Sequence, residues 1–365
     1  MARRLPDWVW PERLGRVDVE AAVRASICAL LPLVLLVACG RGDLIVYTAF
    51  PAFTSLYGRG ERYRDRIVTL LVAGAGFVLV MSLAMLAATV PLDGWQATAV
   101  LATLAAAGVL VSERMQWVPF GATFHVFAFA VVSSVPLAPE QVPGRLGLSM
   151  ATVALCLVVG MAGLLLRRSP PPVPRVPRIA RRAWPGFAAL REVRRRPDAW
   201  RDPVAWWVAG EVAVAVALAI VVVEALGFGH AYWAAVTVVA CMPRPHSRHF
   251  VVKTGHRVVG TALGVLVAGA LLGLQPPAWV LVLAVGALQF ATELFVGRVY
   301  WLGNVFITPL ALTVGYLAQV SALAPLLVDR LVDTLIGGLV LLAVEFAGRP
   351  MARRLLHHAV VAPMR

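Results

Sequence analysis

Residues 67–90, IVTLLVAGAGFVLVMSLAMLAATV, form a run of 24 residues without a charged side chain. An α-helix needs roughly 20 apolar residues to cross the hydrocarbon core of a bilayer. Four arginines lie directly before the run, within residues 59–66, and Pro91 follows it. Because arginine gathers at the cytoplasmic ends of membrane helices, this stretch predicts a transmembrane helix that begins at the cytoplasmic surface.

The composition of the whole chain supports this interpretation. Of its 365 residues, 60% are hydrophobic and only 14% are charged, whereas a soluble domain has about 25% charged residues. The formal net charge is +14, but the arginines lie between apolar segments instead of gathering on one soluble face. We therefore expect membrane lipid as a partner and no nucleic acid.

The same pattern recurs along the chain and predicts an all-α membrane protein with about twelve transmembrane helices. We expect spans at residues 21–40, 44–57, 67–90, 95–112, 117–136 and 146–166, and at 205–227, 230–242, 254–274, 278–296, 299–318 and 329–347. Every second loop is rich in arginine and the loops between are not, which predicts that both termini are cytoplasmic.

Two halves with the same order of spans indicate an internal repeat. Residues 42–46 (GDLIV) align with 229–233 (GHAYW), and 66–68 (RIV) align with 257–259 (RVV). An even number of spans in each half predicts two parallel repeats related by an axis along the membrane normal, with a passage most easily built at their seam. The expected segments are an N-terminal arm (1–20), a first repeat (21–166), a basic Pro/Arg-rich cytoplasmic linker (167–204), a second repeat (205–347) and a cytoplasmic tail (348–365).

Four ordered motifs in the second half resemble a known family. They are residues 231–237 (AYWAAVT), 257–264 (RVVGTALG), 300–310 (YWLGNVFITPL) and 330–337 (RLVDTLIG). Together they resemble fusaric acid resistance proteins, the FUSC or aromatic acid exporter family, over roughly residues 207–345, and the first half resembles it faintly. The chain departs from the family in having Glu211 where a basic residue is often found, and in its short linker.

The resemblance implies an inner-membrane exporter of aromatic carboxylates. The family is more distantly similar to plant aluminium-activated malate transporters, which are dimeric anion channels. Homo-oligomerisation of this chain is therefore left open.

Charged residues inside the spans are candidate substrate-binding groups. Arg24 and Glu211 lie about one turn inside the first span of each half, where they could meet a substrate carboxylate or a proton, pair with each other, or snorkel to the interface. Arg66 and Arg257 begin the third spans and could form a cationic vestibule. For Arg66 we favour anchoring at the inner surface, and for Arg257 we favour a binding role because it opens a family motif.

Polar and aromatic residues complete the candidate site. Paired short spans are a pointer to a transporter site, so Tyr232, Trp233 and Thr237 could contact an aromatic acid, although an interfacial aromatic belt is an alternative. His125, Asn304 and Thr308 are intramembrane polar candidates, and for His125 a bonded contact between helices is the alternative.

Other polar residues have structural explanations. Close helix packing explains the glycines around Gly260 and Gly264. Pairing with nearby arginines explains Glu113 and Glu293. Arg330 and Asp333 are spaced to pair along one helix face, which we favour, although either could also gate the outer mouth.

The sequence therefore predicts a secondary exporter or permease for organic anions, with aromatic carboxylates as one substrate class, in the cytoplasmic membrane. An anion channel of the same architecture and a membrane scaffold without transport activity are the alternatives. No P-loop, G-x-S-x-G or H-E-x-x-H motif occurs in the sequence, so we expect no enzyme activity of those classes, no cofactor and no metal site.

Overall fold

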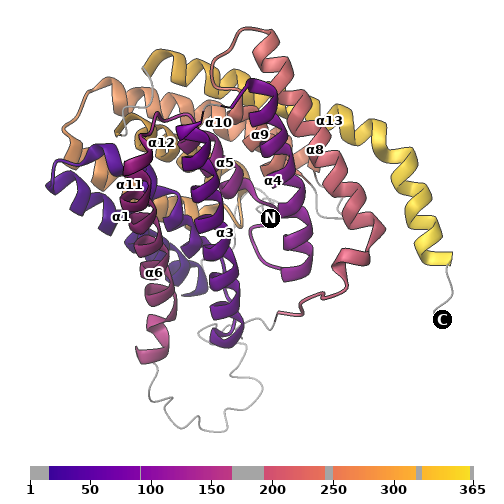
Figure 1. Ribbon diagram of the computed structural model, residues 1–365, viewed down its shortest axis with the longest axis horizontal. Coiled ribbons are helices and arrows are strands. Elements are labelled where there is room, and N and C mark those ends of the chain that lie inside the picture. Colours follow the sequence, from indigo (N-terminus) through magenta and orange to yellow (C-terminus); the bar gives the residue numbers. More distant parts are fainter. Residues whose placement is uncertain (1–15, 91, 167–192, 243–249, 318–322, 362–365) are drawn as a thin grey trace, which may run out of the picture.

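The computed structural model describes residues 16–90, 92–166, 193–242, 250–317 and 323–361. These residues form helices and no strand (Figure 1). Among them, nine helices are long and apolar enough to cross a membrane. They are α1 (Arg16–Ala38), α3 (Tyr63–Thr89), α4 (Gly94–Met115), α6 (Val142–Leu166), α8 (Pro203–Ala225), α10 (Phe250–Gly273), α11 (Ala278–Phe295), α12 (Tyr300–Leu317) and α13 (Leu323–Val361).

Three of the twelve predicted spans are too short for a full crossing, so the predicted count is not reproduced. Residues 44–57 fold as α2 (Val46–Ala49) and the 3₁₀ helix η2 (Pro51–Leu56), residues 117–136 contain only α5 (Thr123–Ser133), and residues 230–242 contain α9 (Tyr232–Cys241). Proline and glycine explain these lengths, because Pro119 and Gly121, with φ of +82° at Gly121, precede α5, and Pro243 follows α9.

The three short segments lie inside the bundle and not at its surface. The side chains of α2, most of η2, and most of α5 and α9 are buried. These short segments leave non-helical backbone at membrane depth. Such backbone is tolerated only where protein buries it or where it lines a cavity. The long helices supply that cover.

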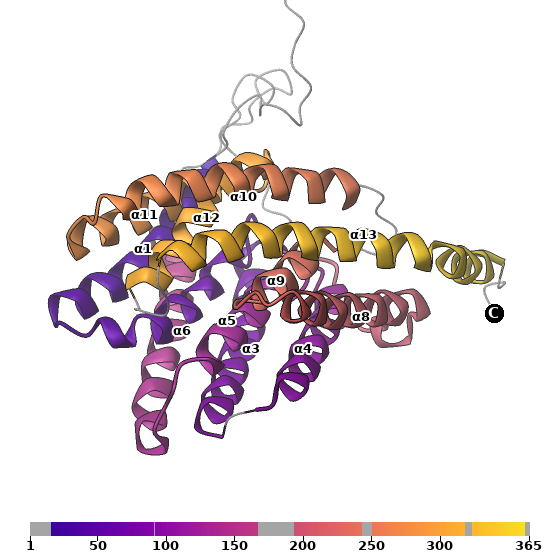
Figure 2. The same ribbon diagram turned by 90° about the horizontal axis from the view of Figure 1, so that it is seen from above.

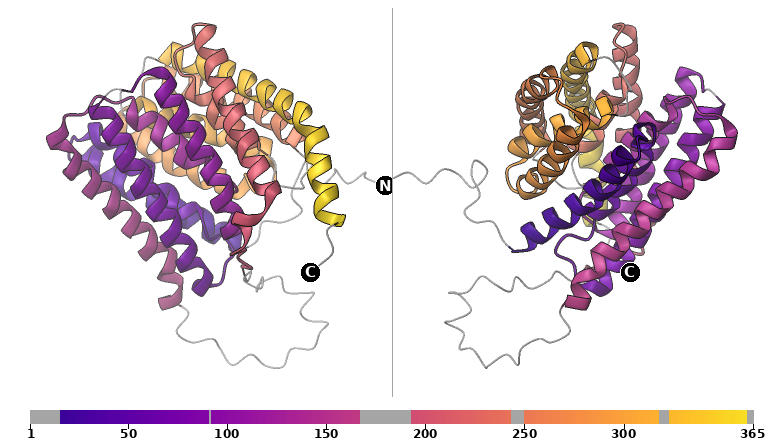
Figure 3. Two further views of the ribbon diagram at one scale, coloured as in Figure 1. Left: turned by 45° about the vertical axis from the view of Figure 1, so that its right-hand side comes forward. Right: turned by 90° about the vertical axis from the view of Figure 1, so that its left-hand side faces the viewer.

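The first half (residues 16–166) and the second half (residues 193–361) form two groups of helices that lie side by side (Figure 3). They interlock through their long helices, because α1 packs against α11 and α4 packs against α8. Within each half, α3 packs against α5 and α6, and α10 packs against α12 and α13. Figure 2 shows α10 and α13 lying side by side.

Glycines allow α10 and α12 to approach closely, as the sequence predicts. A Cβ atom added to Gly260 would collide with the main-chain oxygen of Trp301, and one added to Gly264 would lie 3.0 Å from the oxygen of Val305. This contact fixes α12 against α10 beside the cavity described below.

The outer segments of the chain can be compared with prediction only in part. Helix α13 continues to Val361, beyond the expected end of the last span at residue 347. Most of the predicted N-terminal arm and of the basic linker lie outside the described residues.

Candidate functional site

A cavity of about 470 Å³ lies where the two halves meet. The short segments supply much of its wall, with Phe50 and Phe53 beside α2 and in η2, Phe124 and Phe127 from α5, and Trp233 from α9. Helices α1, α10, α11, α12 and α13 complete the lining. The spans that sequence analysis predicted least well therefore build the site.

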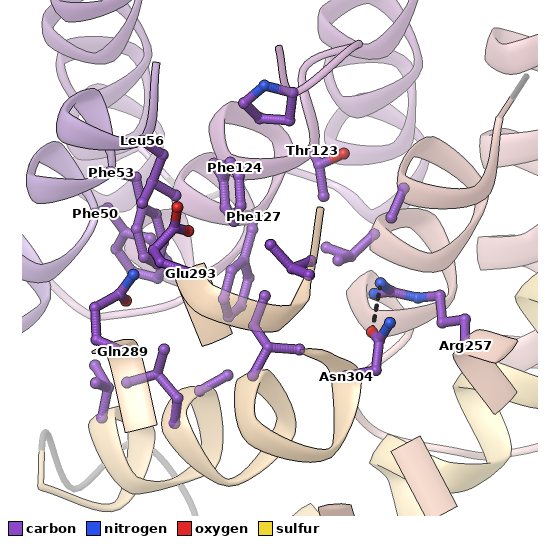
Figure 4. A pocket seen from close by; sticks show the side chains of 18 of the residues that line it. Phe50, Phe53, Leu56, Thr123, Phe124, Phe127, Arg257, Gln289, Glu293 and Asn304 are labelled. Atoms are coloured by element: carbon purple, nitrogen blue, oxygen red, sulfur yellow. Dashed lines mark hydrogen bonds between the residues drawn. The ribbon is translucent and has the colours of Figure 1, made fainter. Parts of the chain in front are cut away.

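Aromatic rings form a continuous surface in this cavity. The ring centroids of Phe50 and Phe127 are 4.9 Å apart, and those of Phe127 and Trp233 are 4.6 Å apart. Tyr232 stacks on Phe127 at 6.2 Å. Figure 4 shows Phe127 between the side that carries Arg257 and the side that carries Glu293. Such a surface suits a planar apolar ligand.

Arg257 on α10 is a buried cation that faces this cavity. Its Nε donates to Thr237 Oγ1 at 3.2 Å, and its Nη1 donates to Tyr300 Oη at 3.3 Å and to Asn304 Oδ1 at 3.4 Å (Figure 4). All these acceptors are neutral, and each distance exceeds the usual 2.9–3.0 Å of an N–H···O bond. Within the described residues, its Nη2 group has no hydrogen-bond acceptor and the guanidinium has no ion pair.

A second cation in the wall, Arg59, is neutralised by carboxylates. Its Nη2 bonds to Asp18 at 2.7 Å, and its Nη1 bonds to the main-chain oxygen of Glu293 at 2.8 Å and approaches the carboxylate at 3.6 Å. Asp18 also pairs with Arg298. The network ties α1, the segment after η2 and the end of α11 together. Glu293 is the one carboxylate among the described residues that line the cavity.

Two of the expected charge pairings of carboxylates are confirmed. Glu293 lies beside Arg59, and Glu113 at the end of α4 pairs with Arg196 at 3.2 Å. The expected pair between Arg330 and Asp333 is wrong. Arg330 instead lies 3.9 Å from the centroid of the Trp233 ring, and neither carboxylate oxygen of Asp333 has a hydrogen-bond partner among the described residues.

Four of the predicted site residues line the cavity: Arg257, Asn304, Tyr232 and Trp233. Thr237 lies behind them and accepts the hydrogen bond from Arg257. With Arg330, which also lines the cavity, the structure brings together residues from all four family motifs.

Arg24 and Arg66 are buried away from the cavity and bound to the backbone. Arg24 donates to the main-chain oxygens of Ser55 and Tyr57, at 3.1 and 3.2 Å, and so satisfies the carbonyl groups at the end of η2. Arg66 donates to the oxygen of Gly58 at 3.1 Å and to that of Gly160 at 3.3 Å, and it pairs with the carboxylate of Glu20 at 2.8 Å. Both guanidinium groups hold the first half together.

The remaining candidates also lie outside the lining. Glu211 on α8 faces α13 at Gly348 and does not meet Arg24. The ring of His125 stacks on Phe77 at 4.0 Å, and its Nε2 lies 3.4 Å from the main-chain oxygen of Ala73, so it joins α5 to α3. Thr308 is buried where α12 packs on Gly264.

Sequence reasoning missed several wall residues. Arg59 and Lys253 were visible only as part of the cytoplasmic charge pattern, and Phe127 only as part of an apolar run. No signal in the sequence placed these residues at one cavity, because they come from segments that lie far apart in the sequence. Among the described residues, no group of three or more His, Cys, Asp or Glu side chains is placed to hold a metal ion.

Comparison with known proteins agrees with the motifs. Residues 218–344 match the sequence model of the family described as fusaric acid resistance protein-like. The chain is also 30% identical over 154 residues to the uncharacterized membrane protein YvaC of Bacillus subtilis, an alignment that covers 42% of this chain and 24% of YvaC. No solved structure matches the chain. The resemblance expected from the sequence is thus confirmed for the second half, because residues 218–344 of this multi-pass membrane protein are similar to fusaric acid resistance proteins.

Proposed function

We propose that this protein is a secondary transporter of organic anions, with aromatic carboxylates as its substrate class, in the cytoplasmic membrane. One observation carries the proposal: Arg257 faces an aromatic cavity between the two halves and has only neutral hydrogen-bond partners among the described residues. A carboxylate bound at Arg257 would place its ring against Phe127 and its neighbours.

The energetic argument rests on the cost of an uncompensated buried charge. A charged side chain costs about 2.5–3.5 kcal/mol at the middle of a membrane helix on insertion scales, and less near a helix end, where Arg66 and Arg257 lie. Arg66 recovers part of this cost through Glu20, whereas Arg257 has long bonds to neutral oxygens. An anionic ligand would supply the missing counter-charge, and a charge-assisted hydrogen bond contributes about 1.5–3 kcal/mol.

The proposal includes the duplicated architecture and the orientation expected from the sequence. Two pairings of long helices support the duplication. α1 and α8 are the first spans of the two halves, and α4 and α11 are the fourth spans. α1 packs on α11, and α8 packs on α4 in the same way, so the first span of each half contacts the fourth span of the other. The arginine-rich loops support cytoplasmic termini.

Reconstitution in liposomes tests the proposal. Wild-type protein should take up radiolabelled benzoate in a saturable manner and catalyse exchange with benzoate inside the vesicle. Asn304→Asp should abolish this flux, because the new carboxylate would neutralise Arg257 at the position where Asn304 Oδ1 now lies 3.4 Å away.

Asn304→Ser is the matched control, since it removes the amide without adding a charge and should keep most of the flux. Conduction without saturation or exchange would favour the channel alternative. Absence of flux for every organic acid tested would leave the scaffold alternative.

A further inference from the structure

Like Arg257, Arg330 on α13 is a buried cation that lines the same cavity. It is 2% exposed and lines the cavity together with Trp233. Its Nε and Nη1 groups are fully buried and have no hydrogen-bond partner among the described residues. Buried polar groups are nearly always paired, so each exception needs an explanation.

The surroundings of Arg330 do not neutralise it by direct contact. The face of the Trp233 ring lies 3.9 Å away, which stabilises a cation without removing its charge. Asp333 lies three residues further along α13, but both of its oxygens are unbonded. Asp329 is engaged by His230.

We infer that Arg330 and Trp233 form a second anion subsite, so that the cavity accepts two negative charges at once and favours aromatic dicarboxylates over monocarboxylates. The inference rests on the proposed function, which places the first carboxylate at Arg257. It adds to that function a second positive charge, which Arg330 on α13 supplies. The aromatic surface of Phe127 and Tyr232 adjoins Trp233 and would carry the ring between the two subsites.

A comparison with the first half supports a ligand-binding role for Arg330. Arg145, which aligns with Arg330 in the sequence, also lies over an aromatic ring, that of Tyr47 at 4.7 Å. Its Nη1, however, donates to Tyr47 Oη at 2.6 Å, and it does not belong to the cavity lining. Both arginines therefore lie over an aromatic ring. Arg145 also donates a hydrogen bond to its ring's hydroxyl, whereas Arg330 has donors without an acceptor among the described residues.

Calorimetric titration of purified protein with benzoate and with isophthalate tests the inference. Wild-type protein should bind isophthalate about tenfold to a hundredfold more tightly than benzoate, the ratio expected for one additional charge-assisted contact. The double variant Arg330→Gln/Asp333→Asn keeps the net charge of α13 and avoids an isolated buried carboxylate. It should lose the isophthalate preference and retain benzoate binding.

Three further outcomes separate the alternatives. Arg145→Gln, the matched control, should keep the preference for isophthalate. If Arg330 served only to balance Asp333, the double variant would bind like the wild type, and the inference would be overturned while the proposed function stood. If wild-type protein bound neither acid, the proposed function would fail, and the inference with it.

Discussion

Arg66 and Arg257 occupy aligned positions near the start of the third span in each half, yet the protein uses them differently. Arg66 is bound to a carboxylate and to two main-chain oxygens inside the first half. Arg257 is held by long hydrogen bonds to neutral groups and faces the cavity. A repeated sequence signal therefore fixes where a cation lies, while its neighbours decide whether the charge is available to a ligand.

The neighbours differ because the two halves differ after the short segments. In the first half, the segment around Gly58 passes beside Arg66, and a Cβ atom on Gly58 would lie 2.8 Å from Arg66 Cγ. In the second half, α9 and α12 surround Arg257 with hydroxyl and amide groups instead. Duplication thus allows one copy to stabilise the bundle and the other to bind the ligand.

Substitution of the two arginines should give the largest difference. Arg257→Gln should reduce benzoate flux by about tenfold to a hundredfold, because about 1.5–3 kcal/mol of charge-assisted binding is lost. Arg66→Gln should instead lower the free energy of unfolding by about 2 kcal/mol, because buried carbonyl groups lose their donor. Flux measured per amount of folded protein separates the two effects, and equal losses of flux in both variants would contradict the assignment.

Glycine substitutions should sharpen the comparison through helix packing. Gly260→Ala should destabilise the protein by about 1–3 kcal/mol, since the added methyl group collides with the Trp301 backbone. Gly76→Ala should be milder, because its nearest neighbour is the side-chain atom His125 Nε2 at 3.0 Å, and alanine favours a helix over glycine. Thermal unfolding in detergent measures both. A larger loss for Gly76→Ala would show that α10 and α12 do not need this close approach.

Glu293 and Glu113 lie at the ends of the fourth span in each half, and their substitution should affect benzoate affinity differently, although by less than substitution of the arginines. Glu293→Gln removes the negative charge from the cavity wall and should tighten benzoate binding by about threefold to tenfold, the range for a partly screened charge. Glu113→Gln should leave the affinity unchanged, because Glu113 pairs with Arg196 away from the cavity. Titration calorimetry distinguishes them, and weaker binding by Glu293→Gln would indicate that the carboxylate itself orders the site.

The smallest effect is expected at His125. His125→Phe preserves the stacking on Phe77 and removes only a long contact of 3.4 Å to the main-chain oxygen of Ala73. We expect benzoate flux to stay within about twofold of the wild type, because such a contact contributes little. Loss of flux with normal folding would identify His125 as part of the transport path.

Hydrophobic runs predicted the long helices well, because the length of an apolar run directly reflects the thickness of the bilayer. The run at 67–90 corresponds to α3, and most other long spans lie close to their predicted bounds. The prediction of a full span at 117–136 was wrong, because apolar composition does not distinguish a helix that crosses the membrane from a short helix that other helices cover. Pro119 and Gly121 carried the contrary signal.

The candidate site was predictable only in part, because the sequence shows which residues are polar but not which groups surround them. The predicted site residues Arg257, Asn304, Tyr232 and Trp233 line the cavity, and all four lie within the family motifs. Arg24 has the same sequence characteristics, but its partners are main-chain oxygens at the end of η2, and a residue pattern gives no information about those oxygens. Arg330 was misjudged because its spacing to Asp333 indicated a pair that the side chains do not form.

A structure of the protein with bound 4-bromobenzoate would test the central claim most directly, since bromine can be located by anomalous scattering. The account predicts bromine inside the cavity near Phe127 and the carboxylate at Arg257 Nη2. Bromine bound only at the lipid-facing surface or beside Arg24, with the cavity empty in a protein that still transports benzoate, would contradict it.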